Sequence, residues 1–238
     1  MLTPTDFLIL GHRGASAYAA DNSREAFRIA AEQGADGVEL DVRRTADDRL
    51  VVHHDPTVGD GTVIVEAELE DLRRRAPGLL TLAEAMEACD GMLVNVEIKN
   101  SPSDPDFDPA HRSADMTVRW LVDHGWDDRV IVSSFNPATI DRVRSLSDDI
   151  STGQLLVPGS EVEAAVVSAR ERGHNAVHPH GSQLTDPIPA ITAARERSML
   201  VLVWTVNDPG FARRLRDAGA TGIITDDPAA IRSGLAPA

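Results

Sequence analysis

The chain has one cysteine, Cys89, and lacks any apolar run of the length, about 18 residues, that a membrane-spanning helix needs. One cysteine cannot close an internal disulfide, so nothing indicates an oxidising compartment. The first residues, MLTPTDFLILGHRG, lack the basic segment and the longer apolar segment of a signal peptide. The sequence therefore predicts a soluble, cytoplasmic protein without stable membrane insertion.

Basic and aromatic residues are also scarce. Lys and Arg number 23 against 38 Asp and Glu, which gives a net charge of -15. This balance argues against a nucleic-acid partner, because phosphate backbones need clustered cations. A small anionic ligand is still compatible with this negative net charge, since a local cation or metal can override the overall charge. Aromatic residues make up 4% of the chain, so the core must consist mainly of aliphatic residues, which suit buried parallel strands. The oligomeric state is not defined by the sequence.

Short apolar segments alternate with longer amphipathic segments along the chain, a pattern that predicts a parallel sheet. Strands are expected near 7–10, 37–42, 93–98, 130–133, 151–156, 176–177, 200–205 and 222–224. Helices are expected near 23–33, 81–88, 112–124, 137–146, 162–172, 185–197, 209–218 and 228–232. Eight such units in 238 residues favour an α/β fold, a (β/α)8 TIM barrel, as a single domain over residues 1–238. An open doubly wound sheet is the alternative.

Two segments interrupt this rhythm. Residues 55–80 carry several Gly and Pro and predict a small insertion after the second strand. Residues 100–110, rich in Pro, Ser and Asp, predict a long loop after the third strand. Thr81 and Glu84 have the spacing of a capping box, and Asn22 or Ser23 is expected to cap the first helix.

Active sites of this barrel lie at the carboxyl ends of its strands, where Glu39, Asp41 and Glu97 are expected. Glu39 and Asp41 are two residues apart on one strand and therefore point to the same side. Two inward carboxylates repel and lose hydration unless a cation joins them. Oxygen ligands suit Mg²⁺ or Ca²⁺, so one divalent metal ion is the expected cofactor. The alternative is that they are surface carboxylates or partners of Arg and Lys.

His12 and His54 also lie beside strand ends near the predicted metal. Histidine titrates near neutral pH, so two of them can act as acid and base in one turnover. Metal ligation is the competing role. The neighbouring His53 is expected to be structural, because strand alternation sends it to the opposite side.

Arg13 and Lys99 are the cations of this cluster, and Arg can bind two phosphate oxygens in parallel. Lys99 could instead neutralise the carboxylates, or do both. Trp204 lies in an otherwise aliphatic strand, where it either packs in the core or forms an apolar wall for the carbon skeleton of a substrate.

Several motifs together resemble those of the glycerophosphodiester phosphodiesterases. They are HRGASAYAADNSREAF, GADGVELDVRRTADDRLVVHHDPTV, VEIK, SSFN, VWTVND and GIITDDP, and they extend over about residues 8 to 230. The resemblance implies a barrel that releases sn-glycerol 3-phosphate and an alcohol from small glycerophosphodiesters. By motif, it implies His12 and His54 as the catalytic pair, Glu39, Asp41 and Glu97 as metal ligands, and Arg13 and Lys99 near the phosphate. A lysophospholipase D-type phosphodiesterase and a non-catalytic phosphate-binding barrel are the alternatives.

The chain departs from the family pattern at three places. Asp21 replaces the usual Glu of the EN motif and shortens that side chain by one methylene. The Arg-Thr-Thr stretch after the H-D-P-T motif is absent. His178, Pro179 and His180 stand where relatives have an Asn-rich segment, and they are expected only to line the mouth of the barrel. The sequence sets neither the headgroup preference nor the identity of the metal.

Overall fold

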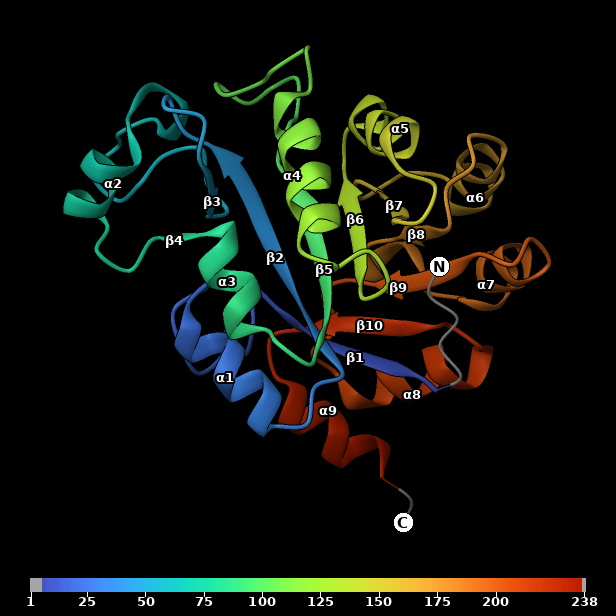
Figure 1. The fold of residues 1–238 in the computed structure, drawn as a ribbon. Coiled ribbons are helices and arrows are strands. Elements are labelled where there is room, and N and C mark those ends of the chain that lie inside the picture. Colours follow the sequence, from blue (N-terminus) through green and yellow to red (C-terminus); the bar gives the residue numbers. More distant parts are fainter. Residues whose placement is uncertain (1–5, 237–238) are drawn as a thin grey trace.

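A computed structural model describes residues 6–236, and in it eight parallel strands close into a ring (Figure 1). In ring order they are β1 (Leu8–His12), β2 (Gly37–Arg44), β5 (Leu93–Ile98), β6 (Val130–Ser134), β7 (Ser151–Leu155), β8 (Ala176–His178), β9 (Leu200–Val203) and β10 (Gly222–Thr225). The first strand pairs with both β2 and β10, which closes the barrel. The predicted TIM barrel is therefore confirmed, and the open sheet is excluded.

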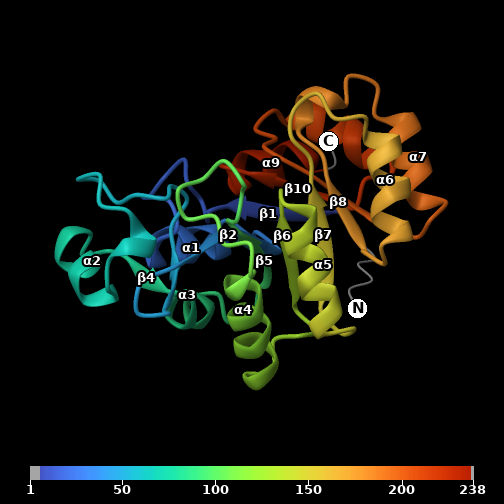
Figure 2. The same ribbon diagram turned by 90° about the horizontal axis from the view of Figure 1, so that it is seen from above.

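Helices cover the outside of the ring, as the view from above shows (Figure 2). They are α1 (Arg24–Glu32), α3 (Leu82–Ala88), α4 (Arg112–Asp123), α5 (Pro137–Leu146), α6 (Val162–Glu171), α7 (Ile188–Arg195), α8 (Pro209–Ala218) and α9 (Pro228–Leu235). Their apolar faces pack on the outward side chains of the strands, for example Phe27 and Ala30 of α1 in one cluster with Val38 and Leu40 of β2. No helix within residues 6–236 is long and apolar enough to cross a membrane.

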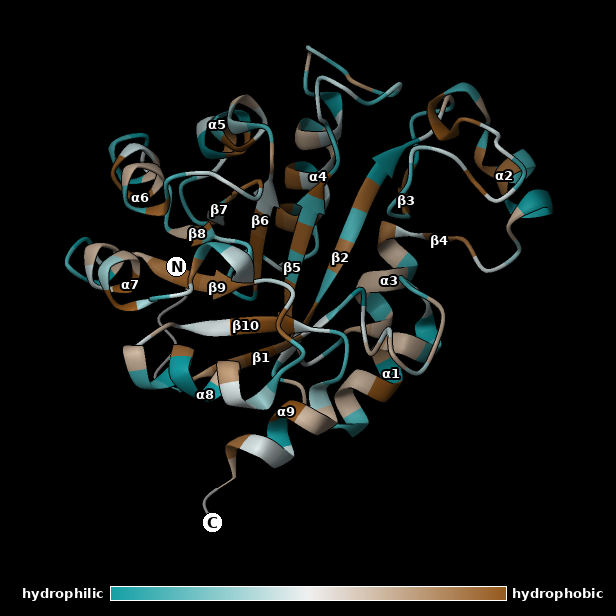
Figure 3. Cartoon of the chain, turned by 180° about the vertical axis from the view of Figure 1, so that it is seen from behind, coloured by the Kyte–Doolittle hydropathy of each residue, from teal (hydrophilic) through white to brown (hydrophobic). Residues whose placement is uncertain are grey.

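The inside of the barrel is apolar at its centre and polar toward one mouth. Four buried residues from four strands form the central cluster: Leu10, Ile131, Leu202 and Ile224. On β2 the residues Val38, Leu40 and Val42 pack outward. The alternation of a strand therefore turns Glu39, Asp41 and Arg43 to the other side, toward the interior. Figure 3 shows β2 as a strand with hydrophilic segments, in contrast to the mainly apolar β1 and β9.

The predicted insertion after β2 is confirmed, and it contains more structure than was expected. Residues 55–80 hold a short 3-10 helix (Ile64–Glu66) and α2 (Leu69–Arg75), and they are flanked by β3 (Leu50–Val52) and β4 (Leu80–Thr81). Outside the ring, β3 pairs antiparallel with β2, and β4 pairs antiparallel with β3. Helix α2 was not predicted, because its sequence LEDLRRR is short, highly charged and buries only Leu72, so it shows no amphipathic period.

Two predicted helix caps are confirmed, whereas some predicted ends differ by two or three residues; the last helix, expected to end at 232, ends at Leu235. Thr81 and Glu84 form the reciprocal capping box of α3, and the side chain of Ser23 caps α1. The seventh strand was expected to reach Thr205, but β9 ends at Val203. Trp204 instead makes an isolated bridge to His180. The regular strand therefore ends one residue before Trp204, the residue predicted either to pack in the core or to form an apolar wall for the substrate.

Candidate active site

All eight residues predicted for the site gather at the carboxyl ends of the strands. Seven of them line one cavity of about 240 Å³: His12, Arg13, Glu39, His54, Glu97, Lys99 and Trp204. The eighth, Asp41, is buried beside it and contacts both Arg13 and Lys99. The short parallel strands place these side chains together because their carboxyl ends share one mouth.

The three carboxylates form a compact buried cluster. Glu39, Asp41 and Glu97 each offer an oxygen, and these oxygens lie within 4.8 Å of one another. Burial raises the pKa of Glu39 well above its ordinary value, and the charges of Asp41 and Glu97 raise it further. Burial also raises the pKa of Glu97. Burial acts in the same direction on Asp41, but the charges of Lys99 and Arg13 outweigh it and hold the pKa of Asp41 below its ordinary value.

The hydrogen bonding of the two Glu39 carboxylate oxygens indicates whether this cluster fits a cation. Its Oε2 accepts a hydrogen bond from the backbone N of Arg13 at 3.0 Å. Its Oε1 is buried and has no hydrogen-bond partner among the described residues. An unpartnered buried carboxylate oxygen beside two other carboxylates is costly without a positive charge. The cluster could therefore hold a hard divalent metal ion, which prefers such oxygen ligands.

The alternative interpretations of the carboxylates account for only part of this arrangement. The cluster does not lie on the surface, since all three residues are buried. Lys99 does act as a partner, with its Nζ 2.8 Å from Glu97 Oε1 and 3.4 Å from Asp41 Oδ1. Burial lowers the pKa of Lys99, but the charges of Glu97 and Asp41 outweigh it and leave the pKa raised, so the ammonium stays protonated. Within residues 6–236, no hydrogen-bond partner reaches Glu39 Oε1.

The loop after β1 holds Arg13 against this cluster. The guanidinium contacts Asp41 through Nε at 3.3 Å and Asp21 through Nη1 at 2.7 Å. Asn22 fixes Asp41 in turn, because its Nδ2 donates to Asp41 Oδ2 at 2.9 Å. Asp21, the residue that departs from the family motif, thus reaches Arg13 from the exposed side and stays outside the carboxylate cluster. Asn22 was predicted only as a possible helix cap, since no local pattern links it to Asp41.

His12, at the end of β1, is held by a carboxylate from the other end of the chain. Its Nδ1 lies 2.7 Å from Asp226 Oδ1. The hydrogen bond with His12, assisted by those from Asn207 and Ser16, lowers the pKa of Asp226 to about 2. Asp226 is therefore ionised near neutral pH and favours a proton on Nδ1, which leaves Nε2 for the cavity. The sequence indicated only that Asp226 follows the last strand.

His54 has a similar carboxylate partner. Its Nδ1 lies 2.7 Å from Asp55 Oδ1, and burial together with the charge of Lys99 lowers the pKa of His54. Its neighbour His53 turns elsewhere, with Nδ1 2.9 Å from the carbonyl oxygen of Asp55. The side chain of His54 is 40% exposed, so a ligand can reach it from the mouth.

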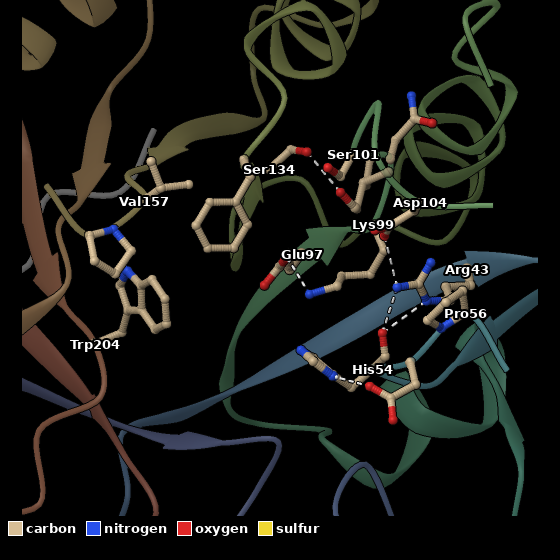
Figure 4. Close-up of a pocket in the computed structure, with 15 residues that line it drawn as sticks. Arg43, His54, Pro56, Glu97, Lys99, Ser101, Asp104, Ser134, Val157 and Trp204 are labelled. Carbon is tan, nitrogen blue, oxygen red and sulfur yellow. Dashed lines mark hydrogen bonds and ion pairs between the residues drawn. The ribbon is translucent and has the colours of Figure 1, made fainter. Parts of the chain in front are cut away.

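An outer cavity of about 430 Å³ continues from the site toward solvent. Figure 4 shows Trp204 and Val157 on one side of it, facing Lys99, Arg43 and His54 on the other. Trp204 combines the two roles that the sequence left open. Its Nε1 donates to the carbonyl oxygen of His178 at 2.9 Å, which fixes the ring, while the same ring lines both cavities.

His178 and His180 were expected to line the mouth, but neither lines the two cavities; they lie next to Trp204, which does. The side chain of His178 is fully buried, and burial lowers its pKa to about 3, so it is neutral. The ring of His180 meets Trp204 edge to face with centroids 4.9 Å apart. The ring centroids of Phe135 and Trp204 lie 5.5 Å apart, also in an edge-to-face arrangement. Aromatic packing thus presents one face of Trp204 to the cavity.

The fold and this mouth define a (β/α)8-barrel enzyme with a charge-dense site. The family described as glycerophosphoryl diester phosphodiesterase matches residues 12–230. A glycerophosphodiester phosphodiesterase of Caldanaerobacter subterraneus is 30% identical over 240 residues, which cover 93% of this chain and 94% of that protein. The chain therefore belongs to the glycerophosphoryl diester phosphodiesterase family, as the motifs implied.

Solved structures agree with this assignment. The crystal structure of a glycerophosphodiester phosphodiesterase from Thermotoga maritima matches with a TM-score of 0.81 at 28% identity, covering 97% of this chain and 99% of that one. A phosphodiesterase of Oleispira antarctica, solved in complex with the product sn-glycerol-3-phosphate, has the same fold, with a TM-score of 0.84 at 24% identity and 96% of each chain covered.

Proposed function

We propose that the chain hydrolyses glycerophosphodiesters to sn-glycerol 3-phosphate and an alcohol. The observation that carries the proposal is the convergence of two carboxylate-bound histidines and a buried carboxylate cluster on one cavity. The family assignment and the product bound by the Oleispira antarctica relative support it. A phosphate-binding protein without activity has no need of two histidines with this arrangement.

Glu39, Asp41 and Glu97 would hold one divalent ion, Mg²⁺ or Ca²⁺. Such an ion supplies positive charge that offsets the charge developing on the phosphate oxygens in the transition state. Arg13 and Lys99 would bind the nonbridging oxygens of the diester from the same side of the cavity. Their contacts with Asp21, Asp41 and Glu97 already fix them, so little reorganisation is needed when the substrate binds.

His12 and His54 would move the protons of the reaction. One histidine removes a proton from the nucleophile, and the other donates a proton to the leaving alkoxide. Asp226 and Asp55 hold the two Nδ1 atoms, so each Nε2 is the atom that exchanges the proton. Neutral histidine is the form that can act as a base, and the lowered pKa of His54 favours this form near neutral pH.

The nucleophile that we favour is the 2-hydroxyl of the glycerol moiety, which is tethered beside phosphorus. In the first step its oxygen bonds to phosphorus, and the bond between phosphorus and the alcohol oxygen breaks, which gives a cyclic glycerol phosphate. In the second step water attacks phosphorus and the bond to the 2-oxygen breaks, which gives sn-glycerol 3-phosphate. The histidines exchange roles between the steps.

A lysophospholipase D-type activity is the second candidate, and the apolar part of the outer cavity favours it. Ile98, Phe135, Val157 and Trp204 line this region. A second cavity of about 280 Å³, between α5 and α6, shares Phe135 and Val157 with it. An acyl-bearing leaving group would find apolar contacts there.

The test is a turnover screen with glycerophosphocholine, glycerophosphoethanolamine and a lysophospholipid, after chelation and with Mg²⁺, Ca²⁺ or Mn²⁺ added back. Release of sn-glycerol 3-phosphate is expected from the first two compounds. The variants His12→Ala and His54→Ala are expected to lower kcat by at least about a hundredfold. His53→Ala is the matched control and should keep kcat. Absence of turnover with every diester and metal would contradict the proposal.

A further inference from the structure

Arg43 is a buried cation that the proposed chemistry does not use. Its side chain on β2 is only 2% exposed. The Nε and Nη2 atoms both donate to the carbonyl oxygen of His54, at 2.9 and 2.7 Å. Its Nη1 lies 2.5 Å from Asp106 Oδ2, and Nη2 lies 3.2 Å from Asp104 Oδ2. Figure 4 shows Arg43 between His54 and Asp104, beside the outer cavity.

These contacts join three segments that build the site. Arg43 itself follows Glu39 and Asp41 on β2. Asp104 and Asp106 belong to the loop over residues 100–110, which lines the outer cavity through Ser101 and Asp104. The third segment carries His54, which lies beyond the end of β3 (Leu50–Val52).

The position of His54 outside the sheet gives the contact with Arg43 its significance. The backbone pairing of this segment with β2 ends with the hydrogen bond from His53 N to Asp41 O at 2.9 Å, so His54 is the first residue beyond it. Two donors from one rigid guanidinium fix both the place and the direction of the His54 carbonyl group. A buried ion pair is a weak source of stability, because desolvation offsets most of the attraction. The arrangement is therefore better explained by geometry than by stability.

We propose that Arg43 is a positioning residue for the reaction, which sets the main chain of His54 and anchors the loop 100–110 to it. This inference rests on the proposed role of His54. The guanidinium of Arg43 bonds to the His54 carbonyl oxygen, Asp104 and Asp106, none of which is a proposed metal ligand, so Arg43 acts through His54. A displacement of about 1 Å in a reacting group can lower the rate about a hundredfold, so loss of this anchor should be visible in kcat.

A double-mutant cycle tests the inference, with glycerophosphocholine as substrate and the activating metal at saturation. Arg43→Gln is expected to lower kcat by about 10- to 100-fold with KM changed by less than about threefold. In the His54→Ala background, Arg43→Gln should lower kcat by less than about twofold, because residues that act as a unit are not additive. Arg44→Gln is the matched control, since Arg44 is also buried but pairs with Asp48, and it should keep kcat within about twofold.

The outcomes separate the inference from the function on which it rests. If His54→Ala lowers kcat as expected and the losses of the two single variants multiply in the double variant, Arg43 does not act through His54 and the inference is overturned alone. Full activity in His54→Ala would overturn the role of His54 and the inference together. If Arg43→Gln does not fold, Arg43→Lys keeps the charge but not the pair of hydrogen bonds that Nε and Nη2 donate to the one carbonyl oxygen. It should still lower kcat by about tenfold, and wild-type kcat in this variant would overturn the inference.

Discussion

His12 and Asp226 are hydrogen-bonded at 2.7 Å although 214 residues separate them along the chain. The pairing of β1 with β10 brings them together. Asp226 also accepts hydrogen bonds from Ser16 and Asn207, so its carboxylate is fixed before it orients the ring of His12.

The variant Asp226→Asn is expected to lower kcat by at least about a hundredfold with little change in KM, because an amide no longer selects the tautomer with the proton on Nδ1. Steady-state kinetics measure the effect. The adjacent Asp227 caps α9, where Asn serves equally well, so Asp227→Asn is the control and should keep kcat. Equal kcat in the wild type and Asp226→Asn would contradict the proposed role of His12.

The same carboxylate predicts a pH dependence of stability. The pKa of Asp226 is lowered to about 2 from an ordinary value of 3.8, so folding favours its ionised form. The stabilisation is complete above about pH 4 and is lost as the pH falls toward 2. The difference in Tm between the wild type and Asp226→Asn should therefore shrink across this window. A difference that is independent of pH would show that Asp226 contributes nothing through its charge.

Glu39→Gln is expected to weaken metal binding while leaving the protein folded. The neutral amide removes a buried charge, so Tm without metal should be at least that of the wild type. A divalent ion at about a hundred times its Kd should raise Tm of the wild type by about 5 to 10 °C but not that of the variant. Glu87→Gln, on the exposed surface, is the control and should respond to metal as the wild type does. An equal metal response in Glu39→Gln would remove Glu39 from the metal site.

A substrate analogue without the glycerol 2-hydroxyl tests the nucleophile. Such a diester should still bind and inhibit competitively. It should be cleaved at least about a thousandfold more slowly than the natural diester, because it lacks the tethered attacking group. Single-turnover measurements with the natural diester and the analogue give this ratio. Cleavage of both at the same rate would assign the attack to water.

Trp204→Ala should weaken binding of the substrate without abolishing chemistry. Loss of the indole surface removes contacts worth about 1 to 2 kcal/mol, which corresponds to a KM raised about tenfold. Trp204→Phe should restore much of this loss, since Phe keeps an apolar ring. Trp120→Ala, on the outer helix α4, is the control and should leave KM unchanged. An unchanged KM in Trp204→Ala would reduce Trp204 to a packing residue.

The sequence predicted the barrel and the composition of its mouth, because both follow from local patterns. Strand and helix periods are visible within each unit, and residues at strand ends must converge once the strands are parallel. The residues that orient this mouth were not predictable in the same way. The contact of Arg43 with His54 depends on how the insertion folds back on β2, and no pattern within β2 reveals it. The end of β9 before Trp204 likewise depends on pairing with residues around Pro179 and His180.

The closure of the ring between β1 and β10 also has a consequence for biosynthesis. A nascent chain that has emerged as far as β9 already contains the carboxylate cluster, both cations and His54. It lacks Asp226, the residue whose carboxylate is hydrogen-bonded to the ring of His12. In the proposed mechanism, catalytic competence would therefore arise late in synthesis, when the last strand joins the first.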